Sequence, residues 1–496
     1  QLAELAACSD AEALRLRTKP PQDPALVATV RAKLASAHAL EATGKFRDGV
    51  AAVAAVAPDV ARAGYRPLEA EAALLEGTLQ HDLDVYQRAT TALERAVWAA
   101  EASGDDPVVA KALIELVKVH GTHARFAESD AAHARATAAL ERIGRAPELS
   151  TDLDYAVGLV ATVRGDLTVA EAALTRALHT AETVHGGELR VASTLVALGK
   201  LGLRRMNDTA APYLERALAI DEKLLGPDHP DLAAVQIALG GAAYERTDYD
   251  GAVARYERGI AILERALGHQ NVQVANALND LAGTRQWQGR TEDALAAIHE
   301  ALAIDEQVLP KADPQTASHL ATEAEVLEQL DRHDDALVAN ERALAMLRAL
   351  YGEEHQDIAD ALHSRALIEL AAGHLERALA DARASLAMFA RVNPAFPTME
   401  LHRTLGRVEL ALHDPVSALA DLDAARRQLE SEGDPAVHAW INGLYGRALV
   451  ETHRDRAQGL ALVTSAYKAL HADDRAGKEA GELERWMRDQ GMPVSH

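Results

Sequence analysis

The sequence predicts an all-α protein built as an array of about eleven helix–turn–helix repeats, and three observations lead to this prediction. Apolar residues make up 48 % of the 496 residues but aromatic residues only 4 %, so the apolar share is mostly Ala and Leu, which favour helices. Runs of β-branched residues with period two are nearly absent. Small residues also recur at a spacing of about 40 residues along most of the chain.

The repeat is defined by a small residue followed seven positions later by a second small residue. Residues seven apart lie on one face of a helix, two turns apart, so both can pack against the partner helix of a hairpin. Small side chains at these positions let two helices approach closely. The first position holds Gly49, Ala89, Ser129, Ala170, Ala210, Ala252, Ala294, Ala336, Ala378, Ala418 and Gly459. The second is small in ten of eleven repeats and holds Val56, Ala96, Ala136, Ala177, Ala217, Gly259, Ala301, Ala343, Ser385, Ala425 and Ala466.

Each repeat is predicted to contain a helix A, a tight turn, a helix B and a longer polar turn. An aromatic residue often stands three residues before the first small position, as at Phe46, Tyr86, Phe126 and Tyr249. A polar break such as "ATGKF" or "WQGR" lies beside or just before it. Such a break ends one helix and starts the next.

The longer turn is clearest at residues 225–233, which read "LGPDHPDLA". We expect Leu225 and Gly226 to end a helix B, with Gly226 in the left-handed conformation. Pro230 is expected to begin the next helix, because its fixed φ suits that position. We interpret His229 as a residue that caps this turn rather than as a functional side chain, so the turn is a spacer between helices.

The repeat resembles the tetratricopeptide repeat, and its period of about 42 residues and its "LGPDHPDLA" turn resemble the kinesin-light-chain type. Gly77, Gly158, Gly240 and Gly406 occupy the glycine position of helix A in that family. The resemblance covers roughly residues 24–472. It implies a right-handed superhelical solenoid of TPR-like repeats.

We expect three segments along the chain. Residues 1–23 are predicted to form a lead-in helix and a proline-rich linker, because Pro20 and Pro24 break a helix that precedes them. Residues 24–472 are predicted to form the repeat array. Residues 473–496 are predicted to form a capping helix and tail with an apolar stripe, a device that covers the open end of a repeat array.

The first 23 residues also resemble the stretch that introduces repeat arrays in bacterial, especially myxobacterial, serine/threonine kinases. In those proteins a Cys-x-Asp-x-x-x-Leu element is followed by a proline-rich joint, as it is here after Cys8. Because the chain begins with Gln rather than Met, we expect that a kinase domain, if the protein has one, precedes Gln1.

Charge and motif content disfavour several classes of function. The formal net charge of −24 repels phosphate backbones, so we expect no nucleic-acid partner. No window approaches 18 consecutive apolar residues, so we expect no membrane insertion by this chain. A P-loop, kinase signatures, H-E-x-x-H and G-x-S-x-G are all absent, so we expect neither an enzyme nor catalytic residues nor a cofactor in this chain.

Histidines and carboxylates also occur at turns between the predicted helices. His120, His123 and His133 leave two interpretations, a zinc site or exposed turn histidines, and we expect no metal site. Carboxylates in "HDLD" (81–84) and "RHDD" (332–335) are expected to cap helices.

The resemblance implies that helix A lines the concave face of the array, where peptides bind in this family. Counting back from Ala294 places Asn276, Asn279 and Gln286 on that face. An amide can donate to a C=O and accept from an N–H, and the resemblance implies that Asn279 contacts a peptide backbone. The neighbouring repeats have no Asn there, so a continuous ladder of amides is missing. Other predicted groove residues, each of which could instead lie at the edge of the core or in solvent, are Trp287, Tyr244, Tyr155, Arg403 and Arg407.

We therefore expect a cytoplasmic scaffold or sensor module that binds a peptide or a partner protein in its groove. The resemblance favours the regulatory region of a bacterial signalling protein similar to a serine/threonine kinase. A free-standing adaptor without an attached enzyme is one alternative, and an enzyme with an unrecognised site is another.

Overall fold

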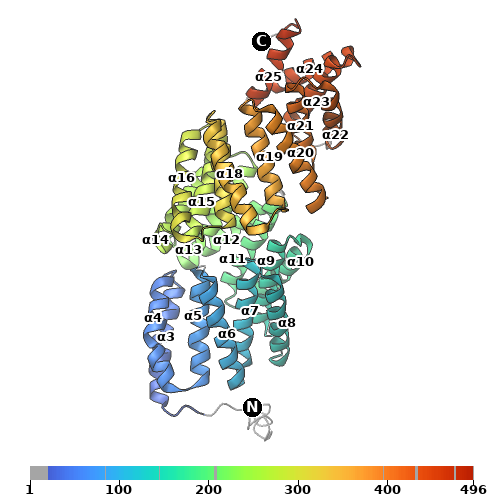
Figure 1. Cartoon of the computed structure of the whole chain (residues 1–496). Helices are drawn as coiled ribbons and strands as arrows, with labels where there is room; N and C mark the ends of the chain where they lie inside the picture. Colours follow the sequence, from blue (N-terminus) through green and yellow to red (C-terminus); the bar gives the residue numbers. More distant parts are fainter. Residues whose placement is uncertain are drawn as a thin grey trace. The chain divides into compact units, whose positions relative to one another are not determined.

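The structure is a computed structural model that describes residues 20–83, 85–144, 146–205, 209–394, 396–429, 434–473 and 476–494. Within these residues there are 23 helices and no β-strand (Figure 1). The predicted all-α fold is therefore confirmed. The predicted lead-in helix falls almost wholly on residues 1–19, outside the described residues.

The helices alternate along the chain as the A and B members of eleven hairpins, and a single helix, α25 (Gly477–Asp489), follows the last hairpin. The A helices are α3 (Pro24–Glu41), α5 (Arg66–Asp82), α7 (Asp106–Thr122), α9 (Pro147–Arg164), α11 (Glu188–Arg204), α13 (Pro230–Glu245), α15 (Val272–Trp287), α17 (Pro314–Gln329), α19 (Gln356–Ala371), α21 (Met399–Ala411) and α23 (Pro435–Glu451). The B helices are α4 (Phe46–Ala63), α6 (Tyr86–Ser103), α8 (Phe126–Arg142), α10 (Leu167–Thr183), α12 (Ala210–Leu225), α14 (Tyr249–Leu267), α16 (Thr291–Val308), α18 (His333–Tyr351), α20 (Leu375–Val392), α22 (Pro415–Arg427) and α24 (Arg456–His471).

The chain divides into two compact units, Gln1–Thr284 and Arg285–His496, and each is described by itself. In the first unit, α5 contacts α7, α7 contacts α9, α9 contacts α11, and α11 contacts α13. In the second unit, the same contacts link α17, α19, α21, α23 and finally α25. No comparable contact joins two B helices within the described part of either unit. The A helices therefore form the inner face of each unit, as helix A does in a solenoid.

The small residues that define the repeat are all buried, as the close-packing argument predicts. The helix-A glycines show why small residues are needed. A Cβ on Gly77 would lie 2.5 Å from the Cγ of Leu93, and a Cβ on Gly158 would lie 2.5 Å from the Cγ of Leu174. Each leucine stands four residues after the first small position, so helix B inserts a large side chain against the bare backbone of helix A.

The turn at residues 225–233 follows the prediction with one correction. Helix α12 ends at Leu225 and α13 begins at Pro230. His229 caps α13, because its Nδ1 accepts a hydrogen bond of 3.2 Å from the backbone N–H of Asp231. The predicted left-handed helical conformation of Gly226 is wrong. Its φ of 84° is positive but its ψ of 167° is extended, a region that glycine alone adopts readily, and this directs the chain away from α12 toward Pro230.

The first hairpin of the first unit reaches the turn before α13. A Cβ added to Gly44, which lies in the turn between α3 and α4, would overlap the Cδ of Pro230. Close by, a Cβ on Gly268 would lie 3.4 Å from Nη1 of Arg47. These contacts join segments that are far apart in the sequence, so the first unit is not an open row of repeats.

The last helix has the features expected of a cap. Helix α25 contacts α24 and α23 and buries Leu483, Trp486 and Met487, the apolar stripe of the predicted capping helix. Among the described residues, no helix combines the length and the apolar character needed to cross a bilayer.

Candidate functional site

The predicted groove residues all lie on A helices, and the structure distributes them between the two units. The first unit contains Tyr155 on α9, Tyr244 on α13, and Asn276 and Asn279 on α15. The second unit contains Gln286 and Trp287 at the end of α15, and Arg403 and Arg407 on α21. The eight residues therefore do not form one site within a unit.

The amide residues predicted on α15, Asn276, Asn279 and Gln286, are each partly exposed. The Oδ1 atom of Asn279 is itself buried and has no hydrogen-bond partner among the described residues. Trp287 is 58 % exposed, which is unusual for so large an apolar side chain. Their contact with a peptide stays a prediction.

The two tyrosines lie at the edge of the core. The ring of Tyr244 packs edge-on against Tyr249 at the start of the partner helix, with 5.7 Å between the ring centroids. Tyr155 packs against a cluster of buried residues that includes Leu174, and burial raises the pKa of its hydroxyl. Packing of the hairpins accounts for both side chains, and their role in binding stays a prediction.

Arg403 and Arg407 lie together in a cavity of about 460 Å³ in the second unit. We call this cavity the arginine pocket. Leu367 and Leu370 of α19 contribute apolar lining. Its charged lining residues are Arg403, Arg407, Arg447, Lys478, Glu328, Glu479 and Glu482.

Helical spacing explains how the charged side chains converge. Arg403 and Arg407 are four residues apart on α21, and Lys478 and Glu482 are four residues apart on α25, so each pair shares one face of its helix. Arg447 comes from α23, between these two helices in the stack. The pocket therefore lies on the inner face of the second unit, next to the cap.

Arg407 is held by several contacts that leave part of its guanidinium available. Its Nη2 lies 3.2 Å from Oε2 of Glu482, and its Cζ lies 5.6 Å from the ring centroid of Trp440. Its Nε is buried and has no hydrogen-bond partner among the described residues. Arg447 is held beside it by a 2.8 Å bond from its Nε to Oε1 of Glu451. These contacts fix the orientation of the cations before a ligand arrives.

Arg403 is the more deeply buried cation. It pairs with Glu400 one turn earlier on α21, and its Nε is also buried without a hydrogen-bond partner. Burial lowers the pKa of Arg403, although a guanidinium remains charged at neutral pH. Burial, followed by the charge of Arg403, also lowers the pKa of His363 to about 4, so this imidazole is neutral and hydrogen-bonds Thr404 at 2.9 Å. The positive charge at this end of the pocket is therefore carried by the arginines, each of which also pairs with a carboxylate.

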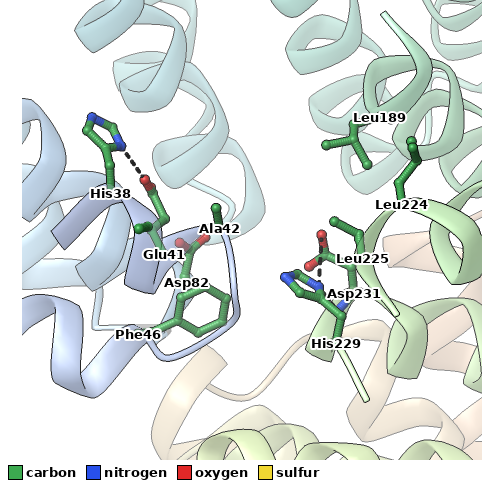
Figure 2. A pocket seen from close by; sticks show the side chains of 11 residues that line it. His38, Glu41, Ala42, Phe46, Asp82, Leu189, Leu224, Leu225, His229 and Asp231 are labelled. Carbon is green, nitrogen blue, oxygen red and sulfur yellow. Dashed lines mark hydrogen bonds and ion pairs between the residues drawn. The ribbon is translucent and has the colours of Figure 1, made fainter. Parts of the chain in front are cut away.

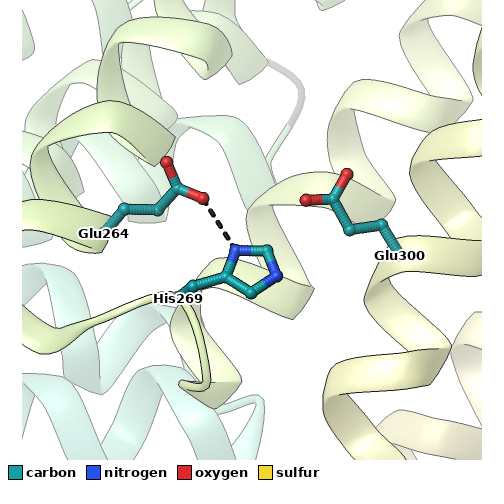
Figure 3. Close-up of side chains that lie close together, drawn as sticks. All are labelled: Glu264, His269 and Glu300. Atoms are coloured by element: carbon teal, nitrogen blue, oxygen red, sulfur yellow. Dashed lines mark hydrogen bonds and ion pairs between the residues drawn. The ribbon is translucent and has the colours of Figure 1, made fainter.

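The histidines considered for zinc have other partners. Nδ1 of His120 lies 3.0 Å from the hydroxyl of Tyr86, whose ring also packs against His123 at 4.7 Å between centroids. His120 is buried rather than exposed. Across the described part of the chain, His120, His123 and His133 are not grouped at metal-ligand spacing. In the turn after α14, His269 forms a 2.8 Å bond to Glu264 (Figure 3); Glu300, which the figure also shows, belongs to the second unit.

Residues 203–265 and 273–349 match the sequence profile of the tetratricopeptide repeat. These two stretches carry tetratricopeptide repeats. No curated protein matches the sequence.

Three solved structures of low sequence identity are similar to parts of this chain. A signal transduction ATPase with numerous domains from Pyrococcus horikoshii, described as having a tetratricopeptide repeat sensor, has a TM-score of 0.53 and 14 % identity over 79 % of this chain and 55 % of its own. The apo form of RapI has a TM-score of 0.50 and 13 % identity over 69 % of this chain and 99 % of its own. A putative kinesin light chain of Podosopora anserina has a TM-score of 0.37 and 21 % identity over 41 % of this chain and 96 % of its own.

Sequence reasoning found two of the four cations of the arginine pocket. Arg447 and Lys478 were missed, although Arg447 lies on a helix A close to the repeat offset of Arg407 and could have been found by that signal. Lys478 and Glu482 lie on the capping helix, which has no counterpart in the repeats. Their proximity to α21 depends on how the cap packs.

Proposed function

We propose that this tetratricopeptide-repeat scaffold binds a carboxylate of a partner protein or peptide in the arginine pocket. The observation that carries this proposal is the pair of guanidinium groups on α21 whose Nε atoms are buried and have no hydrogen-bond partner in the described part of the chain. A guanidinium presents its N–H donors in a planar fork that matches a carboxylate, and such bonds are among the stronger ones in proteins.

The charge around the pocket supports an anionic ligand. Four basic and three acidic side chains line the pocket. Basic residues therefore outnumber acidic ones in its lining, whereas the chain as a whole has a net charge of −24. A single carboxylate, from an acidic side chain or a chain terminus, would satisfy the remaining donors. A strongly acidic stretch would be repelled by Glu328, Glu479 and Glu482.

A peptide-display selection against the full chain tests the proposal. The selected peptides should be enriched in one Asp or Glu, or in a free C-terminal carboxylate, beside apolar residues that fit the Leu367 and Leu370 lining. The best peptide is then titrated against wild type and Arg403→Gln. Loss of a charge-assisted hydrogen bond is expected to weaken binding by about 1.5–3 kcal/mol, which is a factor of roughly 10 to 150.

The matched control is Arg427→Gln. Arg427 lies on α22, the B helix of the same hairpin, where its side chain is 70 % exposed and pairs with Asp423 one turn away. This variant removes the same charge from the outer face and should bind the peptide as wild type does. Equal losses in the two variants, or selected peptides without any carboxylate preference, would contradict binding in the pocket. Circular dichroism melting curves confirm that both variants are folded.

Asn276 and Asn279 of α15 are proposed as a separate contact in the first unit. Asn279→Ala should weaken the binding of a peptide that contacts α15 by about 1–2 kcal/mol, roughly tenfold. The reason is that one amide would no longer pair with the peptide backbone. Gln273 on the same helix is exposed, so Gln273→Ala serves as the control. A loss confined to Gln273→Ala would show that the peptide contacts another face of α15.

We also propose that the array is the sensing part of a larger signalling protein. The Pyrococcus protein is described as having a tetratricopeptide repeat sensor, and this analogy supports a sensing role here. The resemblance of residues 1–23 to the lead-in of kinase repeat arrays supports a serine/threonine kinase as the attached enzyme. The reading frame upstream of Gln1 distinguishes this arrangement from a free-standing adaptor.

A further inference from the structure

The first unit contains a second cavity, of about 710 Å³, whose lining has the opposite charge. We call it the acidic cavity. It lies between the first hairpin with the end of α5 on one side and α11, α12 and α13 on the other (Figure 2). The polar residues that line it are His38, Glu41, Asp82, His229 and Asp231.

His229 contributes an unused hydrogen-bond donor to this cavity. Its Nδ1 accepts the backbone N–H of Asp231 in the cap of α13, and a neutral imidazole has one acceptor and one donor nitrogen. The proton therefore resides on Nε2. This atom is buried and has no hydrogen-bond partner among the described residues, while the side chain is only 6 % exposed. Figure 2 shows the ring on the cavity wall that faces Phe46 and Asp82.

Asp82 contributes a carboxyl group from the opposite wall. The sequence predicted that this carboxylate would cap a helix, which is wrong, because α6 begins after Val85 without a side-chain cap. Asp82 makes no hydrogen bond to another described residue. Burial, and then the carboxylates of Glu41 and Glu115, raise the pKa of Asp82 to about 8, so its carboxyl group is mostly protonated at neutral pH and a cation bound beside it would favour the ionised form.

The rest of the lining is acidic or apolar. Glu41 is paired with Nδ1 of His38 at 2.8 Å, and its charge still adds to the field in the cavity. The Asp231 side chain is 60 % exposed on the α13 side. Leu189 and Leu224, which are 44 % and 48 % exposed, supply apolar wall that the protein itself does not cover.

We propose that the acidic cavity binds an alkylammonium group that is followed by a carbonyl, the chemistry of a lysine side chain with its own peptide bond. The ammonium would lie near Asp82 and Glu41, and the carbonyl would accept the hydrogen bond from Nε2 of His229. The alkyl chain between them would cover Leu224. This site lies in the first unit and does not depend on the arginine pocket.

The geometry gives such a ligand a second effect. One wall of the cavity belongs to the first hairpin and the other to α12 and α13. The two walls contact each other where Gly44 lies against Pro230. A ligand bound to Asp82 and His229 together bridges the two walls. Its binding should therefore raise the thermal unfolding temperature of the full chain.

Calorimetric titration of the full chain with three small probes tests the ligand class. N-acetyl-lysine-N-methylamide has the ammonium and the carbonyl, N-acetyl-norleucine-N-methylamide lacks only the ammonium, and cadaverine has two ammonium groups and no carbonyl. We expect the lysine derivative to bind at least tenfold more tightly than the norleucine derivative. Weaker binding of cadaverine than of the lysine derivative identifies a peptide lysine as the natural source, whereas tighter binding of cadaverine identifies a free diamine and overturns the role of His229. No preference for the ammonium overturns the proposal.

Two variants with matched controls locate the binding. Asp82→Asn should weaken the lysine derivative at least tenfold, while Glu245→Gln, at the equivalent position of the α13 hairpin, should leave it within twofold. His229→Asn keeps a side chain that can cap α13 but removes the Nε2 donor, and should weaken binding several-fold.

The control for the His229 variant is His355→Asn. His355 caps α19 in the same way, with its Nδ1 accepting the backbone N–H of Asp357 at 3.2 Å, but it lies in the second unit. Both histidine variants should shift thermal stability by similar amounts, and only the His229 variant should lose the ligand. Equal binding by wild type, Asp82→Asn and His229→Asn would overturn the proposed site even if the probe binds elsewhere.

Discussion

Replacing His319 with Ala is expected to destabilise the second unit strongly, because the substitution leaves a carboxylate buried without its partner. Nδ1 of His319 on α17 lies 2.7 Å from Oδ2 of Asp305 on α16, and the two side chains are 2 % and 0 % exposed. Oδ1 of Asp305 already lacks a hydrogen-bond partner among the described residues. Removal of the imidazole would therefore isolate the whole carboxylate from both protein and water.

The expected magnitude follows from the burial of this pair. Removal of one partner of a buried ion pair costs about 3–5 kcal/mol, so we expect about 3 kcal/mol for His319→Ala and a similar loss for Asp305→Leu. The neighbouring repeats show what an apolar pair does at the same two positions. There the positions are filled by buried side chains, Leu347 with Ala361 and Leu263 with Ala277.

The double variant Asp305→Leu/His319→Ala copies those apolar pairs and should be no less stable than either single variant. The two single losses would then fail to add by at least about 2 kcal/mol, which is in the range measured for contacting residues. Urea unfolding followed by far-UV circular dichroism gives the three free energies, and amide hydrogen exchange in α16 and α17 locates the change. Single losses that add to the double loss within about 0.5 kcal/mol would refute the reasoning.

Three further predictions concern packing, the tight turns and pH. Ala336→Phe should overpack its hairpin, because Ala336 is 0 % exposed, and destabilise by roughly 1–3 kcal/mol; hydrogen exchange should rise in that hairpin and its neighbours, and a uniform rise along the chain would contradict a repeat array. Ala124 has a φ of 55° in the turn between α7 and α8, so Ala124→Gly should raise stability by up to about 1 kcal/mol, and a lower melting temperature would contradict this. Burial, and then the charge of Asp231, raise the pKa of Asp221 to about 7. Because the folded-state pKa exceeds the unfolded value of about 3.9, the unfolded state binds fewer protons and stability falls as pH rises between these two values. Asp221→Asn should therefore be more stable than wild type at pH 8 but not at pH 4, and parallel urea midpoints across this range would refute the assignment.

Most of the fold could be predicted from the sequence because one packing rule recurs in every repeat. The regular spacing of the small residues predicted the position of each hairpin. The glycines of helix A, such as Gly77 and Gly158, pack against a leucine of helix B. Gly199 plays the same role against Leu214 but was missed, because it stands eleven rather than twelve residues before the small position. The conformation of Gly226 was predicted wrongly because its ψ is set by where the next helix starts, not by the residue itself.

The two cavities could be predicted only in part, because they depend on how repeats stack. Arg403 and Arg407 were predicted from their offset within one repeat, which a single repeat already defines. The partner of Arg407 in the capping helix, Glu482, could not be found in this way. The acidic cavity could not be predicted, because Asp82 and His229 come to line the same cavity only through the stacking of several repeats. In the sequence each is typical of an ordinary turn.

The contact between Gly44 and Pro230 limits how the first unit can change its length during evolution. An open row of repeats tolerates the gain or loss of a hairpin, because each repeat contacts only its neighbours. Between α4 and α13, loss or duplication of one hairpin would shift Pro230 by a full repeat step away from Gly44 and separate the walls that hold Asp82 and His229. The number of hairpins in this stretch is therefore constrained by the contacts of the first hairpin with Pro230 and Gly268, whereas hairpins beyond α14 are free of that constraint and are where related proteins should differ in length.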